Sequence, residues 1–381
     1  MTDTKTEFGA VVPLKPGTPA TEQNTIEHKP GTPAATSTGF NSLWERFDEY
    51  AADMKATPKT VKTGFDSIDR DLKFNGFTML GGASGAGKTS LCLNIALNRA
   101  RVGLKTVFYS LEMPVFTLVN RLVCMDCSVD YIHAADYWQP FKDKAAEYMK
   151  NIYFVGITDI VTDNLPKFDT GENGDLVKTI EQARGEEQGA GDVLIIIDSL
   201  HLLPADAADV RAATNENVRK IRTLTDTYHV NTLVIGQSKR GEKSFEYIGD
   251  IYDRKTGRHD TAQLRAQFRE SALIEYAADA LFYILNDNRP PTEIGTETKW
   301  LCAVKNRIAD TGINSDQKIK GFEFNGIHYQ FADKYGYTEC LKQAAEDAAK
   351  DEAKNASSNG KQTGKQATRN NKRNTKNDTI I

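Results

Sequence analysis

The sequence predicts an α/β fold in which a mostly parallel central sheet is flanked by helices and followed by a C-terminal β-hairpin. From Thr63 onward, short apolar runs alternate with segments of helical periodicity. The run 193–197 is an unbroken series of large aliphatic residues, as in a central strand that is covered on both faces. A glycine-rich stretch, 82–89, joins the first strand to a helix.

That stretch fits the phosphate-loop pattern G-x-x-x-x-G-K-[ST] at every fixed position. An apolar strand, 77–80, precedes it, and apolar residues at helical spacing follow it. Glycines allow the backbone amides to turn inward, and the following helix adds positive charge at its N-terminus. We therefore predict that the chain binds ATP with Mg2+, with Lys88 at the β and γ phosphates and the Thr89 hydroxyl on the metal. The predicted nucleotide-binding residues are Gly82, Ala83, Ser84, Gly85, Ala86, Gly87, Lys88, Thr89 and Ser90.

The remaining elements follow in alternation. Strands are predicted at 105–110, 152–155, 193–197, 232–235, 280–285 and 300–304, and helices at 115–124, 176–186 and 210–228. The segment 239–267 is polar and charged, which predicts a mobile loop. Residues 322–329 predict a hairpin with Asn325 and Gly326 as its type I′ turn, and the fold is expected to end near 333–337.

Two polar side chains end buried strands of the predicted sheet. Asp198 follows 193–197, where its carboxylate would face the phosphate loop and hold the magnesium shell, so Thr89 and Asp198 are the predicted metal residues. Gln237 follows 232–235, where an amide can sense the γ phosphate or orient the attacking water.

The segments outside this domain have other compositions. Residues 1–40 are rich in Pro, Gly and Thr, which predicts a disordered arm. Residues 41–58 predict an amphipathic helix whose apolar stripe, with Trp44 and Phe47, either folds back on its own domain or docks on a neighbouring subunit. The globular domain is assigned to 59–338, and 339–381 to a tail that passes from helix to disorder. From 354 to 381 the tail holds seven basic residues against one acidic. This basic tail either binds nucleic acid or only keeps the protein in solution.

The composition limits the cellular locations that we expect for the protein. The chain has 381 residues, of which 39% are hydrophobic, and its net charge is −4. No apolar run approaches the roughly 20 residues of a membrane span, and the N-terminus lacks a signal-peptide core, so we expect a cytoplasmic protein without membrane contact. Five cysteines, an odd number, fit reduced thiols. Cys124 and Cys127 have C-x-x-C spacing without a second pair, which favours structural thiols over zinc.

Residues 60 to about 335 resemble the RecA-type ATPase domain of DnaB-family replicative helicases. The resemblance rests on motifs in the family's order, namely Thr63-Gly64-Phe65-Asp66, the phosphate loop, Ser110-Leu111-Glu112-Met113-Pro114, the Asp198 strand, Gln237, Arg269-Glu270-Ser271, Lys305-x-Arg307 and Phe324-Asn325-Gly326. It implies a RecA-like fold and a hexameric motor. Its implied partners are single-stranded DNA, a primase or a helicase loader.

The resemblance also implies roles for individual residues. Glu112 matches the glutamate that activates water, and its place beyond a strand adjacent to the phosphate loop agrees with that role. Lys305 and Arg307 match the basic pair that enters the neighbouring subunit's site. Arg269, Glu270 and Ala272 match the loop that follows one DNA strand inside the ring.

Three features depart from the family pattern. Ala272 stands where the family usually has glycine. The segment between Gln237 and Arg269 is about a dozen residues longer than usual. Residues 1–40 are too short and polar for the N-terminal collar domain, and the lack of a collar is a feature of plasmid and phage helicases.

The sequence therefore predicts an ATP hydrolase and DNA helicase of the DnaB type, a ring that hydrolyses ATP between subunits, translocates on single-stranded DNA and unwinds duplex in replication. The alternative is a RecA-fold ATPase that is not a helicase, such as a recombination mediator or a regulatory ATPase of a mobile element. A metabolic P-loop kinase is a third interpretation, which the trans Lys-x-Arg pair disfavours.

Overall fold

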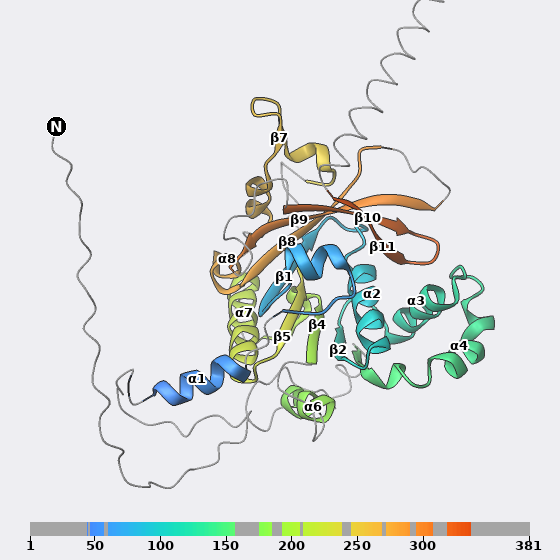
Figure 1. Ribbon diagram of the computed structural model, residues 1–381, viewed down its shortest axis with the longest axis horizontal. Helices are drawn as coiled ribbons and strands as arrows, with labels where there is room; N and C mark the ends of the chain where they lie inside the picture. Colours follow the sequence, from blue (N-terminus) through green and yellow to red (C-terminus); the bar gives the residue numbers. More distant parts are fainter. Residues whose placement is uncertain are drawn as a thin grey trace, which may run out of the picture.

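A nine-stranded sheet with helices on both faces forms the body of the protein (Figure 1). The computed structural model describes residues 44, 46–56, 60–156, 175–184, 193–205, 209–237, 245–268, 272–289, 295–307 and 318–336. The strand order is β11-β10-β9-β8-β1-β5-β4-β2-β3. The predicted α/β class with a mostly parallel sheet is thereby confirmed.

Six neighbouring strands of the sheet are parallel, and three antiparallel strands complete one edge. The parallel strands are β1 (Phe77–Gly82), β2 (Lys105–Ser110), β3 (Ile152–Gly156), β4 (Val193–Asp198), β5 (Asn231–Ile235) and β8 (Ala280–Asn286). The antiparallel strands are β9 (Thr296–Asn306), β10 (Ile319–Asn325) and β11 (Gln330–Gly336). All predicted strands are present, with bounds that differ by a few residues.

Two hydrophobic clusters, one on each face, hold the helices to the sheet. One face carries α2 (Lys88–Arg101), α3 (Val115–Cys127) and α4 (Trp138–Ala145), and the other α6 (Asp175–Arg184), α7 (Val210–Thr227) and α8 (Ala272–Ala277). Short helical turns complete the chain: η1 (Ser67–Leu72), η2 (Ala134–Tyr137), η3 (Met149–Asn151), η4 (Leu200–Leu202), η5 (Ile248–Ile251) and η6 (Thr261–Phe268). In the part of the chain that the structure describes, no helix has the length and apolarity to cross a membrane.

The segment predicted as a mobile loop is largely regular. Residues 245–268 form η5, an antiparallel hairpin of β6 (Tyr252–Asp253) and β7 (Arg258–His259), and η6, whereas 238–244 lie outside the described residues. Ile251 and Leu264 are fully buried in the core. The prediction was wrong for 245–268, because a few apolar residues anchor an otherwise polar segment.

The C-terminal hairpin is confirmed, but its turn differs from the prediction. Asn325 pairs with Gln330, which leaves the four residues 326–329 in the loop. Gly326 does not adopt positive φ, which a type I′ turn would require, while Tyr329 does, at 57°. The Asn325 side chain instead accepts hydrogen bonds from the amides of Ile327 and His328, both at 3.0 Å, and this local bonding selects the longer loop.

The helix predicted over 41–58 appears as α1 (Phe47–Ala56), with 41–43, 45 and 57–58 outside the described residues. Trp44 and Phe47 stack on each other with ring centroids 6.3 Å apart, yet they are 84% and 55% exposed. Their aromatic faces are therefore not buried against the chain's own domain, and docking on a neighbouring subunit stays a prediction. The predicted N-terminal arm and C-terminal tail lie outside the described residues.

Candidate active site

The phosphate loop connects the end of β1 to the first turn of α2. Gly87 caps α2 with a φ of 99°, a conformation that side chains disfavour, and a Cβ there would lie 3.1 Å from the Phe331 ring. At Gly82 a Cβ would lie 2.6 Å from the side chain of Ile284 on β8. The sequence therefore needs glycine at these two positions, and the helix N-terminus faces the space enclosed by the loop.

Lys88 folds over this loop. Its Nζ donates hydrogen bonds to the carbonyls of Gly82 and Ala83, both at 2.8 Å. Burial lowers the pKa of Lys88, and the nearby carboxylates of Asp198 and Glu112 oppose that shift. An ammonium in this position is held where phosphates would bind, at the centre of the loop.

Asp198 and Thr89 meet across the loop. Asp198 ends β4, and its Oδ2 accepts a hydrogen bond of 2.6 Å from the Thr89 hydroxyl. Its other oxygen, Oδ1, is buried and has no hydrogen-bond partner among the described residues. A hydroxyl beside a carboxylate with one unsatisfied oxygen is a donor set that suits Mg2+. The residues present therefore fit the metal that the sequence predicts.

Burial also changes the protonation of Asp198. Desolvation raises its pKa from 3.8 to about 6, with a further increase from the Glu112 charge and an opposing effect of the Thr89 hydrogen bond. A carboxyl group with this environment is costly to ionise until a cation arrives. The site therefore holds negative charge that a bound metal would relieve.

Asp198→Asn should stabilise the protein free of nucleotide and metal, by about 3 kcal/mol at pH 7.5. The folded pKa lies above the unfolded one, so the stability that Asp198 contributes is fully present below about pH 4 and is lost as the pH rises through about 6. Asparagine carries no such charge. Urea unfolding in EDTA from pH 5 to 8 should show that the free energies of unfolding of the two proteins converge at low pH. A difference that does not change with pH would contradict this account.

Glu112 lies next to this pair, in the turn after β2. Strands β2 and β4 align Ser110 with Asp198, and the backbone amide of Glu112 donates to the Asp198 carbonyl at 3.2 Å. The Glu112 side chain is exposed, and its charge acts on both Lys88 and Asp198. The structure thus brings Lys88, Thr89, Glu112 and Asp198 together at one edge of the sheet.

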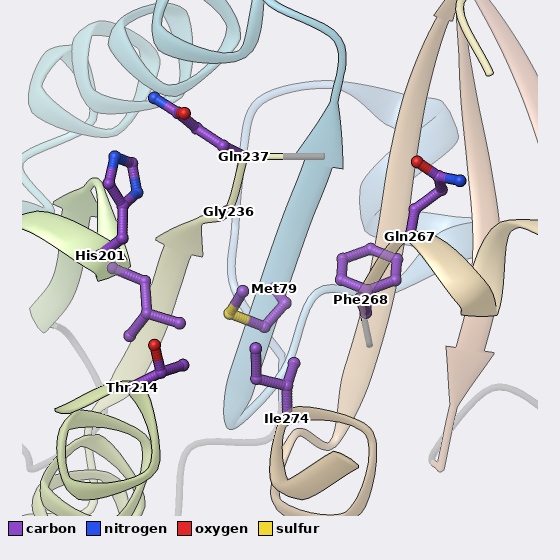
Figure 2. A pocket seen from close by; sticks show the side chains of 9 residues that line it. Met79, His201, Thr214, Gly236, Gln237, Gln267, Phe268 and Ile274 are labelled. Atoms are coloured by element: carbon purple, nitrogen blue, oxygen red, sulfur yellow. The ribbon is translucent and has the colours of Figure 1, made fainter. Parts of the chain in front are cut away.

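Gln237 lies at the same edge, just after β5, above a small pocket on the α7 face. Figure 2 shows Gln237 and His201 at the upper end of this pocket and Phe268 on its opposite wall. The lining residues are Met79, Leu200, His201, Thr214, Gly236, Gln237, Gln267, Phe268 and Ile274. Phe268 also packs on Gly81, where a Cβ would lie 2.9 Å from its ring. The pocket thus joins the ends of β1 and β5 to the chain that precedes Arg269.

Lys305 and Arg307 lie at the opposite end of the sheet. Lys305 pairs with Leu281 at the start of β8, whereas Gly82 pairs with Ile284 near the other end of that strand. Lys305 Nζ donates to the carbonyls of Glu275 and Ala278, at 2.5 and 2.6 Å. The two basic residues are thus not brought to the phosphate loop of their own chain.

Arg307 is held by Asp279. Its guanidinium donates to Asp279 Oδ1 at 3.0 Å and to the Tyr276 carbonyl at 2.7 Å, and its side chain is 49% exposed. Asp279 Oδ2 in turn accepts from the Phe77 amide at 3.0 Å and from Arg222 at 2.7 Å. Lys305 on β9 and Arg307, one residue beyond the end of β9, therefore both reach toward the C-terminal end of α8.

The predicted DNA loop is described only in part. Arg269 and Glu270 lie outside the described residues. Ala272 is the first residue of α8, where an alanine needs no unusual dihedral. The position at which the family usually has glycine is therefore compatible with alanine here.

Sequence reasoning missed Arg121. It is the single charged residue of the helix predicted over 115–124, and that isolation in an apolar segment could have drawn attention to it. Its guanidinium lies 4.8 Å from the centroid of the Tyr329 ring, and its charge lowers the pKa of Asp198. Its Nε is buried without a hydrogen-bond partner among the described residues. The charges of Arg121 and Lys88 therefore act on the same carboxylate, that of Asp198.

Cys124 and Cys127, the C-x-x-C pair, lie on α3. Cys124 is buried and Cys127 partly buried, both as free thiols, and burial raises the pKa of Cys124 to about 11. Within the described ranges, no group of three or more His, Cys, Asp or Glu side chains is arranged to hold a metal ion.

The sheet order, the phosphate loop and the Asp198 strand define a RecA-like nucleotide-binding domain. The family model for the DnaB-like helicase C terminal domain matches residues 60–318, and the chain belongs to this family. It is thus a DnaB-type helicase and ATP hydrolase at the level of the family. A search of curated proteins finds no match.

Two solved structures share the fold. One is described as "The Structure Of A DnaB-Like Replicative Helicase And Its Interactions With Primase", with 18% identity and a TM-score of 0.55, over 77% of this chain and 68% of that chain. The other is described as an ATPase domain, with 16% identity and a TM-score of 0.51, over 78% of this chain and 100% of that chain. At these identities the likeness supports the fold.

Proposed function

We propose that this chain is the subunit of a hexameric, ATP-driven ring that translocates on single-stranded DNA and unwinds duplex DNA in replication. One observation carries the proposal: Lys88, Glu112 and Asp198 lie at one end of the sheet, and Lys305 and Arg307 at the other. A subunit with this arrangement offers an incomplete site at one end and the missing cations at the other. A ring of subunits in head-to-tail contact would complete every site.

Within one subunit, the loop amides and Lys88 would bind the phosphates of ATP. Thr89 and Asp198 would hold Mg2+, which when bound neutralises charge on the β and γ phosphates. Glu112 would accept the proton of the attacking water, because its carboxylate is exposed beside Asp198. Gln237 would orient that water or sense the terminal phosphate, and Arg121 would add a donor from α3.

The neighbouring subunit would supply Lys305 and Arg307. The half-exposed guanidinium of Arg307 can reach a partner's phosphate by exchanging its bond to Asp279. Cations delivered in this way neutralise charge that develops in the transition state. Hydrolysis would therefore depend on assembly.

DNA would pass along residues 269–272. We infer that Arg269, Glu270 and the backbone at Ala272 follow one strand, and that the pocket between Gln237 and Phe268 links their position to the nucleotide. A primase or a helicase loader would be a further partner, in line with the primase named for the first structural relative.

The test is ATP hydrolysis measured with and without single-stranded DNA across a protein dilution series. We expect DNA to stimulate hydrolysis and the specific activity to fall on dilution, because each site needs two subunits. Unwinding of a forked substrate would then separate a helicase from a recombination mediator, which binds DNA without strand displacement. Activity proportional to monomer concentration and indifferent to DNA would refute the ring.

A further inference from the structure

The β6–β7 hairpin has a basic tip that the proposed hydrolysis site does not use. Residues 254–258 read Arg-Lys-Thr-Gly-Arg, with three cations and no acidic residue, and all five are exposed. Within the described part of the chain, Arg254, Lys255 and Arg258 form no ion pair and no side-chain hydrogen bond. We call residues 254–258 the basic tip.

Local hydrogen bonds fix the shape of the basic tip. Asp253 Oδ1 accepts from the Lys255 amide at 2.9 Å, and Oδ2 accepts from the Thr256 hydroxyl at 3.0 Å. The Gly257 amide donates to the Asp253 carbonyl at 2.9 Å, and Gly257 adopts a φ of 67°. The acidic side chain at the base is thus used to order the turn, while the basic side chains remain exposed to solvent.

The residues on either side of the hairpin pack into the core and hold it in place. The Asp260 amide donates to the Ile251 carbonyl at 2.9 Å, and Ile251 and Leu264 are fully buried. Tyr247 forms a bridge with Asn286 at the end of β8. Figure 1 shows the hairpin, marked β7, projecting from the body beyond the sheet and away from α4 and α6. The basic tip is therefore held outward by a fixed support.

The charge of the basic tip and its exposed neighbour Tyr252 favour a polyanion with aromatic bases as the ligand. The net charge of the chain is −4, and the segment 354–381 has seven basic residues against one acidic, so the remainder is strongly acidic. Tyr252, 46% exposed, lies beside the basic tip and contacts His259 edge to face at 5.2 Å. Cations next to an exposed ring are the elements with which proteins bind single-stranded nucleic acid. An acidic peptide would use the charge but not the ring.

We propose that the basic tip, with Tyr252, binds the backbone of single-stranded DNA at a contact separate from residues 269–272. The helix η6 follows the hairpin in the sequence and ends at Phe268, one residue before Arg269, so one segment of the chain would carry both contacts. This inference rests on the proposed function, since it requires that the chain binds single-stranded DNA.

The test uses the full chain and the triple variant Arg254→Ala/Lys255→Ala/Arg258→Ala. Binding of labelled oligo(dT) is followed by fluorescence anisotropy between 50 and 300 mM salt. Each phosphate contact to a single strand contributes about 0.7 to the slope of log affinity against log salt, so the slope should become shallower by about 2. Affinity at 50 mM salt should fall about tenfold or more. Tyr252→Ala should weaken binding without changing the slope, because stacking releases no counterions.

The matched control is Lys62→Ala/Lys142→Ala/Lys150→Ala, which removes three exposed cations away from the hairpin and should keep the wild-type slope. Unfolding temperatures will show whether each variant keeps its fold, and Arg254→Ala alone should change the slope by about 0.7. A wild-type slope in the triple variant would overturn the inference while leaving the proposed function intact. Competition by polyglutamate as strong as by oligo(dT) would also overturn it. Wild-type protein that binds no DNA would refute the proposed function itself.

Discussion

Arg307→Ala should reduce the turnover number for ATP hydrolysis by about 10^3-fold or more, because a cation delivered in trans stabilises charge that appears only in the transition state. Nucleotide affinity should change much less, since the loop amides and Lys88 remain. Steady-state hydrolysis with saturating single-stranded DNA measures the loss, and fluorescent nucleotide binding measures what is retained. Arg219→Ala, an exposed arginine on α7, is the matched control and should behave as wild type.

Mixing two inactive proteins tests whether Arg307 acts on a neighbour. Lys88→Ala lacks the phosphate contact but keeps Arg307, and Arg307→Ala keeps Lys88. In a mixed ring, some interfaces join an intact Lys88 to an intact Arg307, so hydrolysis should return in part. No recovery in rings shown to contain both variants, or a wild-type rate in Arg307→Ala, would refute the trans role.

Glu112→Gln should reduce the turnover number by about 10^2- to 10^4-fold, the range that a positioned general base contributes. Glutamine keeps the size of the side chain but cannot accept the proton. ATP should still bind, because Lys88 and the loop are unchanged, and the variant should therefore hold DNA in the presence of ATP. Glu181→Gln on α6, also exposed, is the control. Unchanged hydrolysis in Glu112→Gln would require another base.

The sequence was sufficient to predict the strands and the nucleotide loop, because both leave local patterns. The run 193–198 is apolar up to its final carboxylate, and the structure places that carboxylate 2.6 Å from the Thr89 hydroxyl. Parallel strands bring their carboxyl ends to one edge, so positions far apart in sequence could be assigned to one site. That Lys305 and Arg307 lie away from that edge could not be predicted from local patterns, because it follows from the antiparallel pairing of β9 with β8.

The features that were missed depend on tertiary contacts. The order of 245–268 comes from a few buried side chains, such as Ile251 and Leu264, within a polar segment. The turn after β10 depends on the side chain of Asn325. The isolation of Arg121 in an apolar helical segment marks the residue, but its effect on the distant Asp198 carboxylate became evident only from the folded structure.

Asp279 links the Arg307 side chain to strand β1. Asp279 holds Arg307 with one oxygen and the first amide of β1 with the other, and β1 ends at Gly82. A strand of six residues is about 20 Å long and stiff when neighbours pair with it on both sides. Strand β1 would therefore act as a rigid connection between Arg307, which the proposed ring places in the neighbouring subunit's site, and the phosphate loop of the same subunit. In the proposed ring, a tilt of the loop after hydrolysis would move Arg307 within the site of the neighbouring subunit. The order in which the subunits hydrolyse ATP would then be set inside each subunit.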